Sequence, residues 1–241
     1  MFFYGATDKG LKREINEDAF GFEKISDNIG FAVVCDGMGG AEGGEIASQK
    51  AVDFITNSLK KSLKDGMKNN SVRYILESAV ETANSLIYDI SQNNEKLKGM
   101  GTTIVLAVVN ENALHIAHAG DSRAYLLRGN EIHRLTVDHS MVQTLLDHGK
   151  LTEDEAKVHP NKNIITRALG VEKHVVADLS EVYLQENDVL LFCTDGLTNY
   201  VDEINILKLL KEDASKAPEK LIQMANKAGG GDNITAVSLL V

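Results

Sequence analysis

Four aspartates of this sequence stand beside glycine at the ends of short apolar stretches. Residues 31–35 lead into Asp36-Gly37, and residues 189–193 lead through a threonine into Asp195-Gly196. Gly231-Asp232 precedes the last apolar stretch, and Gly120-Asp121 lies between two others. Carboxylates gathered at strand ends repel one another and lose hydration, and a divalent cation would relieve both effects. Oxygen ligands suit Mg²⁺, Mn²⁺ or Ca²⁺ rather than zinc, and neighbouring glycines let a backbone carbonyl approach such an ion.

The same dipeptides have a simpler interpretation. Asp-Gly is a common turn sequence, and one such aspartate by itself is better explained as a turn former. Four of them in similar settings, with Arg13, Asn16, Glu17 and Asp18 just before the second apolar stretch, leave both interpretations open.

Short strands and amphipathic helices would have to position these side chains. Strands are predicted for residues 2–7, 19–22, 31–35, 103–109, 113–119, 122–128, 175–183, 189–193 and 234–241. Long helices are predicted around residues 46–59 and 72–90, where apolar residues recur at three- and four-residue spacing. Shorter helices are expected at residues 203–211 and 218–228, the second with proline in its first turn, and the polar stretch 140–159 favours helix.

The order of these elements indicates the fold class. The connections at residues 110–112 and 120–121 are short, so we expect antiparallel hairpins there. Strands and helices do not alternate as in βαβ units, which predicts an α+β fold with helices covering antiparallel sheets. No Pro-, Ser- or Gln-rich linker and no internal repeat divides the 241 residues, so we expect a single domain over residues 1–241.

The composition excludes several classes of protein. Asp and Glu number 35 against 25 Lys and Arg, a net charge of −10, whereas nucleic acids and anionic membranes require a basic surface. The N-terminus lacks the basic and apolar segments of a secretory signal, and no apolar stretch approaches the roughly 20 residues that span a bilayer. Two cysteines are too few for a secreted disulfide scaffold. We therefore expect a soluble, cytoplasmic protein with reduced thiols.

Eight short motifs follow one another along the chain. They are Arg13-Glu14-Ile15-Asn16-Glu17-Asp18, Asp36-Gly37-Met38-Gly39-Gly40, Gly101-Thr102-Thr103, Gly120-Asp121-Ser122-Arg123-Ala124-Tyr125, Asp138-His139-Ser140, Thr166-Arg167-Ala168-Leu169-Gly170, Thr194-Asp195-Gly196-Leu197 and Gly231-Asp232-Asn233-Ile234-Thr235. Their order resembles that of the metal-dependent serine/threonine protein phosphatases of type 2C, in the bacterial stand-alone form. Each motif is weak alone, but the eight together span essentially the whole chain.

The resemblance implies a fold and a metal site. The fold would be a four-layer αββα sandwich, with the site in a cleft between the edges of two antiparallel sheets. By motif position, Asp36 would bridge two cations, and the carbonyl of Gly37 would bind one of them. Asp195 and Asp232 would ligate the other cation together with Asp36.

The resemblance also assigns roles around those ligands. Glu17 and Asp18 would act largely through metal-bound water. Asp121, together with Asp195, would hold a third, weaker cation, and Arg13 would bind the substrate phosphate.

The implied activity is Mn²⁺- or Mg²⁺-dependent hydrolysis of phosphoserine and phosphothreonine in proteins, with two cations per site and a possible third. Two cations can direct a water at phosphorus, so no protein nucleophile is required. The implied partners are phosphorylated proteins, including a serine/threonine kinase that the enzyme opposes, and we expect a monomer. Two alternatives stay open. One is a narrow regulator acting on a single anti-sigma-antagonist-type protein, and the other is a non-catalytic phosphoprotein-binding or metal-sensing module on the same fold.

Other reactive side chains have structural interpretations. Cys35 and Cys193 lie on apolar strands outside any phosphate-cradling loop, so we expect them to fill space. His115 and His118 would point to opposite faces of one strand, which argues against a shared metal. His139 is either structural or catalytic.

Two features stay undecided. Met38 stands where eukaryotic members commonly carry histidine, so the general acid for the leaving group is either a metal-bound water or a histidine from elsewhere. Residues 140–162 correspond to the variable flap beside the active site of bacterial relatives, and they either shape substrate access or form an ordinary surface excursion.

The glycine-rich loop after Asp36 is no dinucleotide fingerprint, because Glu42 replaces the third glycine.

Overall fold

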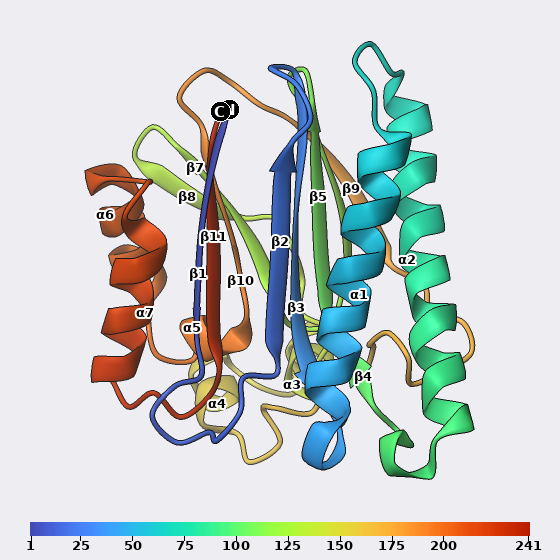
Figure 1. The fold of residues 1–241 in the computed structure, drawn as a ribbon. Coiled ribbons are helices and arrows are strands. Elements are labelled where there is room, and N and C mark those ends of the chain that lie inside the picture. Colours follow the sequence, from blue (N-terminus) through green and yellow to red (C-terminus); the bar gives the residue numbers. More distant parts are fainter.

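The computed structural model describes the backbone of residues 1–241 and every side chain except those of residues 40–42. Its strands form two antiparallel sheets that lie face to face (Figure 1). The five-stranded sheet has the order β1-β11-β10-β7-β8. Its strands are β1 (Phe2–Asp8), β11 (Ile234–Leu240), β10 (Val189–Cys193), β7 (Arg123–Arg128) and β8 (Glu131–Arg134).

The second sheet has six strands in the order β2-β3-β5-β6-β9, with the short β4 paired to β3. These strands are β2 (Asp18–Lys24), β3 (Ile29–Met38), β4 (Gly101–Thr102), β5 (Ile104–Asn110), β6 (Ala113–Ala119) and β9 (Asp178–Tyr183). All seven residues of β5 and of β6 are buried, because the strands in the middle of this sheet are covered on both faces.

Helices cover the outer face of each sheet and complete four layers (Figure 1). The six-stranded sheet is covered by α1 (Gly40–Ser62) and α2 (Asn69–Asn93), and the five-stranded sheet by α6 (Glu203–Glu212) and α7 (Ala217–Lys227). On α2 the buried Val72, Leu76 and Val80 recur every four residues, so one stripe of the helix faces the sheet. Separate apolar cores fill the space under each helix pair and the space between the sheets. The expected αββα sandwich is confirmed.

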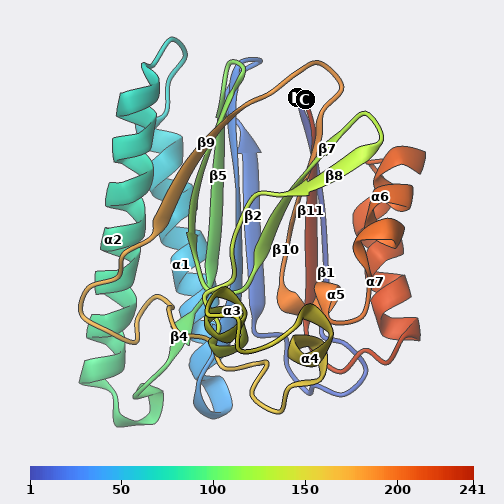
Figure 2. The same cartoon turned by 180° about the vertical axis from the view of Figure 1, so that it is seen from behind.

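The short helices lie at one end of the sandwich. Figure 2 shows α3 (Met141–Asp147) and α4 (Glu153–Val158) beside α5 (Asp195–Thr198), at the end opposite the two chain termini. The 3-10 turn η1 (Glu95–Leu97) follows α2. None of the helices with described side chains is long and apolar enough to cross a lipid bilayer.

One of the two expected hairpins is wrong. β5 and β6 pair antiparallel as predicted, but β6 and β7 belong to different sheets. Residues 120–122 therefore carry the chain from one sheet to the other, and Gly120 allows this with φ +118°. A short connection is compatible with a hairpin within one sheet and with a crossover between two sheets. The crossover forms here because the apolar faces of β6 and β7 pack in different sheets. The predicted strand 175–183 begins only at Asp178, and neither β8 nor α5 was anticipated.

Candidate active site

Two carboxylates face each other at the end of the β2–β3 pair. Asp18 and Asp36 are directly paired across these antiparallel strands. The backbone of Asp36 is fixed by its neighbours: its N–H donates to Thr103 Oγ1 and its carbonyl accepts from Thr102 Oγ1, both at 2.9 Å. Gly37 is buried directly after it. The strand end thus holds Asp36 rigidly beside Asp18.

The other sheet contributes two more carboxylates. Asp195 opens α5 immediately after β10, and its Oδ2 accepts from Asn199 Nδ2 at 2.9 Å. Asp232 lies just before β11, and its Oδ1 accepts from the N–H of Asn233 at 2.8 Å. Because β10 and β11 are adjacent and antiparallel, the end of one and the start of the other meet at the same edge.

These carboxylates interact across the gap between the sheets. Asp36 and Asp195 lie close enough for the charge of one carboxylate to affect the pKa of the other. Burial, followed by repulsion from Asp18, Asp195, Asp121 and Asp232, raises the pKa of Asp36 well above its usual range. Burial, followed by repulsion from Asp232, likewise raises the pKa of Asp195. The cleft therefore concentrates more negative charge than the protein alone stabilises.

Asp121 joins this group from the turn between the sheets. It is nine-tenths buried, and burial together with the charge of Asp195 raises its pKa well above the usual range. The following Ser122 shares a hydrogen bond of 2.7 Å with Thr103, whose hydroxyl also accepts from the N–H of Asp36. Thr103 therefore bonds both the backbone of Asp36 and the residue that follows Asp121.

Asp18 provides the clearest evidence that the site fits a cation. Its Oδ2 accepts from Thr194 Oγ1 at 2.9 Å and from Thr235 Oγ1 at 2.7 Å. Its Oδ1 is buried and has no hydrogen-bond partner among the described residues. Burial is the main cause that raises the pKa of Asp18 to about 7. A buried carboxylate oxygen without a partner is costly, and a divalent cation or its hydration water would satisfy it.

The donor set indicates which cation fits. The converging groups are carboxylates, which suit Mg²⁺ or Mn²⁺. Within the described part of the chain, no three His, Cys, Asp or Glu side chains enclose an ion on their own. A backbone carbonyl and water would have to complete the coordination, as is usual for Mg²⁺, which keeps several waters.

Arg13 lies at the rim of this group. Its Nη2 is 2.9 Å from Asp232 Oδ1, and its side chain is 46% exposed. The rest of the guanidinium therefore faces solvent, where a phosphate can reach it. Its Nη1 lies 4.0 Å from Glu17 Oε2, at the limit of an ion pair.

Glu17 is held mainly through its own backbone. Its N–H donates to Asn233 Oδ1 at 2.8 Å, and its carbonyl accepts from the N–H of Gly37 at 3.0 Å. Burial raises its pKa, although Arg13 opposes the shift. Glu17 thus lies beside the carboxylate group rather than within it.

The structure also reveals residues to which the sequence assigned no role. Asn233 is buried, and its amide donates to the carbonyls of Lys9 and Ile15 while accepting from the N–H of Glu17, all within 2.9 Å. This single side chain holds the loop that carries Arg13. Asn233, Thr194 and Thr235 all lie within the recognised motifs, but nothing in their spacing indicated these contacts.

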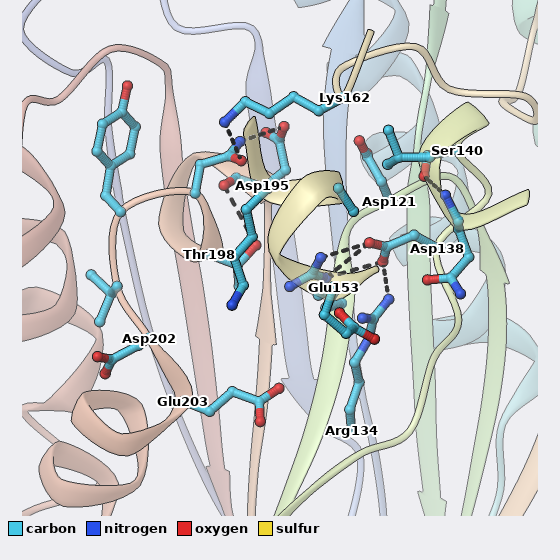
Figure 3. A pocket seen from close by; sticks show the side chains of 18 of the residues that line it. Asp121, Arg134, Asp138, Ser140, Glu153, Lys162, Asp195, Thr198, Asp202 and Glu203 are labelled. Carbon is cyan, nitrogen blue, oxygen red and sulfur yellow. Dashed lines mark hydrogen bonds and ion pairs between the residues drawn. The ribbon is translucent and has the colours of Figure 1, made fainter. Parts of the chain in front are cut away.

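A cavity of about 810 Å³ opens beside Asp121 and Asp195 (Figure 3). One wall is formed by the flap, including Val142 and Ala156, and the other by residues 198–205. From the flap, Lys162 Nζ donates to Asn199 Oδ1 at 3.4 Å, and Asn199 in turn bonds Asp195. The flap thus borders the carboxylate group, as expected from its place in the sequence. The described residues that line this cavity include no histidine.

His115, His118, Cys35 and Cys193 are not among the residues that line the cavity. His115 Nδ1 is 3.5 Å from Glu181, whereas the ring of His118 stacks on His139 with centroids 4.7 Å apart, so the expected divergence of the first two is confirmed. Cys35 and Cys193 are buried free thiols, and burial raises the pKa of Cys193 to about 12. Neither is a reactive thiolate at neutral pH.

Comparison with known proteins agrees with this architecture. The protein phosphatase 2C family matches residues 11–229. The serine/threonine phosphatase stp of Listeria monocytogenes serotype 4b (strain F2365) is 39% identical over 233 residues, which cover 96% of this chain and 92% of the relative. The structure of the S. agalactiae serine/threonine phosphatase superposes with a TM-score of 0.92 at 35% identity, over 100% of this chain and 99% of that one.

A second solved structure concerns the metal. The catalytic domain of the serine/threonine protein phosphatase PstP, in complex with two manganese ions, has a TM-score of 0.87 and 33% identity, over 100% of this chain and 98% of that one. The family match, the near-complete coverage and the shared sandwich lead to one conclusion. The chain belongs to the protein phosphatase 2C family, in its bacterial stand-alone form.

Proposed function

We propose that the cleft between Asp18, Asp36, Asp195 and Asp232 is the active site of a metal-dependent phosphatase that hydrolyses phosphoserine and phosphothreonine in proteins. The observation that carries this assignment is the convergence of carboxylates from both sheets, among which Asp18 is buried and has one oxygen without a partner among the described residues. Such a group of like charges has no structural benefit unless cations neutralise it.

Each ligand has a proposed role. Asp36 and the carbonyl of Gly37 would hold cations from the six-stranded sheet, with Asp36 shared between two of them. Asp195 and Asp232, which both come from the five-stranded sheet, hold the other. When bound, the cations supply the positive charge that activates a water and stabilises the phosphoryl oxygens.

The neighbouring residues complete the site. Asp18 and Glu17 would act through water, which agrees with the Oδ1 of Asp18 that has no partner among the described residues. Asp121, with Asp195, forms a third, weaker cation site.

Arg13 binds the substrate phosphate. Its planar guanidinium offers several N–H donors, of which the bond to Asp232 uses one edge. Two phosphoryl oxygens can be gripped by the edge that faces solvent. The same bond to Asp232 holds the guanidinium of Arg13 beside the carboxylates.

The protein acts on phosphorylated proteins. The proposal also includes three further points. The protein opposes a serine/threonine kinase, it works as a monomer in the cytoplasm, and its flap selects among phosphoproteins. The flap cavity supports the last point, because it adjoins Asp121 and Asp195 and is large enough for the residues that flank a phosphorylated side chain.

The test is hydrolysis of a phosphothreonine peptide and of p-nitrophenyl phosphate with Mn²⁺, with chelator, and by Asp36→Asn. We expect chelator to abolish turnover and Asp36→Asn to lower kcat at least a hundredfold. Asp27→Asn serves as the matched control, because Asp27 is 92% exposed at the far end of the same strand pair. Normal turnover by Asp36→Asn, or in chelator, would overturn the assignment. Phosphopeptide binding without turnover in Mn²⁺ would instead indicate the non-catalytic module.

A further inference from the structure

Both ring nitrogens of His139 are occupied. The side chain is nine-tenths buried, Gly120 N–H lies 3.1 Å from Nδ1, and Nε2 lies 3.1 Å from Asp178 Oδ2. The backbone N–H of His139 also donates to the carbonyl of Gly120 at 2.7 Å. His139 therefore holds both polar backbone groups of one glycine.

These partners determine the protonation of the ring. A backbone N–H can only donate, so Nδ1 must be the unprotonated nitrogen, and the proton lies on Nε2 facing the Asp178 carboxylate. Burial lowers the pKa of His139, which agrees with a neutral ring at pH 7. The carboxylate thus selects the tautomer that can accept from Gly120.

Gly120 is the residue before Asp121, and the turn is clamped on both sides. On the far side, Ser122 bonds Thr103, and Thr103 accepts from the N–H of Asp36. On the near side, the ring of His139 accepts a hydrogen bond from the N–H of Gly120. Gly120 has φ +118°. Glycine can adopt many other backbone conformations, so these hydrogen bonds are needed to hold it in this one.

The clamp continues to the segment that returns from the flap. Asp178 Oδ1 bonds Arg167 at 2.5 Å, and the carbonyl of His139 accepts from the N–H of Thr166 at 2.8 Å. Arg167, Asp178, His139 and Gly120 form a continuous series of bonds that ends beside Asp121.

We propose that His139, oriented by Asp178, is a positioning residue that sets the Gly120–Asp121 turn and thereby the cation affinity of the Asp121 carboxylate. This inference rests on the proposed role of Asp121 as a cation ligand. It assigns His139 no contact with substrate, and it explains why a buried histidine stands outside the cavity yet within a motif of the active site.

Two substitutions separate the two ring nitrogens. In His139→Asn, the side-chain oxygen lies near the position of Nδ1 and can still accept from Gly120, whereas in His139→Gln the polar atoms reach only toward Asp178. His115→Gln is the matched control, because His115 is also a buried histidine beside a carboxylate, but it lies on β6 on the same face as Ala117 and Ala119, which pack in the core under α1 and α2. Titration calorimetry with Mn²⁺ alone, on the metal-free full chain, gives the readout, together with Asp121→Asn as the reference.

We expect His139→Gln to weaken the Asp121-dependent Mn²⁺ site about 10- to 100-fold, the range usual for groups that orient metal ligands. His139→Asn should retain most of the affinity, and His115→Gln should match the unaltered protein. His139→Gln combined with Asp121→Asn should bind no more weakly than Asp121→Asn alone, because both changes act on one site.

The inference is overturned if His139→Gln binds Mn²⁺ normally, or if its effect adds fully to that of Asp121→Asn. If Asp121→Asn itself binds Mn²⁺ like the unaltered protein, the proposed third site fails and the inference with it, while the Asp36 test stands apart. Should His139→Gln not fold, ¹⁵N NMR of the unaltered metal-free chain decides, because a proton on Nδ1 of His139 at pH 7 contradicts the clamp.

Discussion

Asp18 on β2 lies directly opposite Asp36 on β3, so two carboxylates occupy one cross-strand pair at a sheet end. Like charges in this position destabilise a sheet, and burial makes the effect larger. Both pKa values are raised, that of Asp18 to about 7. The two carboxylates therefore make this strand end less stable than a pair of neutral residues would, and cation binding relieves their repulsion.

Removal of the metal should lower thermal stability. A cation present at a hundredfold its Kd stabilises a protein by about 2.7 kcal/mol, which corresponds to about 5–10 °C for a domain of this size. We expect chelator to lower the Tm of the Mn²⁺-loaded protein by that amount at pH 7.5, and less at pH 5, where protons partly neutralise the carboxylates. Differential scanning calorimetry checks this, and an unchanged Tm in chelator at pH 7.5 contradicts it.

Asp18→Asn should stabilise the metal-free protein at neutral pH. The pKa of Asp18 is about 7 in the folded chain against an ordinary 3.8, so the folded state loses stability as pH rises from about 4 to about 7 and no further above that. The asparagine oxygen can still accept from Thr194 and Thr235. The gain should be below about 1 kcal/mol at pH 4 and on the order of 4 kcal/mol at pH 8. Urea unfolding in chelator at both pH values measures it, and an equal gain at both would exclude the titration of Asp18 as the cause.

Arg13→Ala should weaken phosphate binding without removing the cations. Loss of a charge-assisted hydrogen bond costs about 1.5–3 kcal/mol, so we expect kcat/KM for a phosphopeptide to fall about 10- to 100-fold. Arg13→Lys should recover only part of it, because an ammonium group cannot grip two oxygens in a fixed plane. Lys12→Ala, next to it and exposed, is the control. Equal losses in Arg13→Ala and Lys12→Ala would point to general charge attraction instead.

Val142→Trp should block the flap cavity. Val142 lines the cavity, whereas Val158 lies on the same flap, 82% exposed and outside the lining, so Val158→Trp adds the same bulk elsewhere. We expect Val142→Trp to lower kcat/KM at least tenfold for a phosphopeptide but not for p-nitrophenyl phosphate, which has no flanking residues. Equal behaviour of the two variants toward both substrates would mean that the flap is an ordinary surface excursion.

Gly196→Ala should disrupt the metal site through packing. A Cβ on Gly196 would overlap the backbone carbonyl of Asn233, so Asp195 and Asp232 would be pushed apart. We expect a loss of at least about 2 kcal/mol in stability, with weaker Mn²⁺ binding. Gly129→Ala is the comparison, because φ +59° strains it by only about 1–2 kcal/mol and open space surrounds it. Normal Mn²⁺ affinity in Gly196→Ala would show that the close contact between Gly196 and the carbonyl of Asn233 is not needed for the site.

The sequence by itself determined the residue types of the site and the local elements that carry them. Alternating and continuous apolar stretches indicated the strands, and the aspartates after Cys35 and Cys193 could be recognised as strand-end carboxylates. The order of the motifs indicated the family, and with it the sandwich. These features are local, since a strand or a helical stripe depends on residues only a few positions apart.

Only the tertiary structure decided which groups meet. Arg13 and Asp232 are 219 positions apart, and Asp18 and Thr235 are 217 apart, so their contacts depend on the order of strands within and between the sheets. The same order places β6 and β7 in different sheets, which turned an expected hairpin into the crossover that presents Asp121. The bonds of Asn233 and His139 follow from that crossover and from the packed ends of the strands. Side-chain patterns specify which face of a strand is buried, but strand order is set by the packing of all layers together, and no short stretch of sequence carries it.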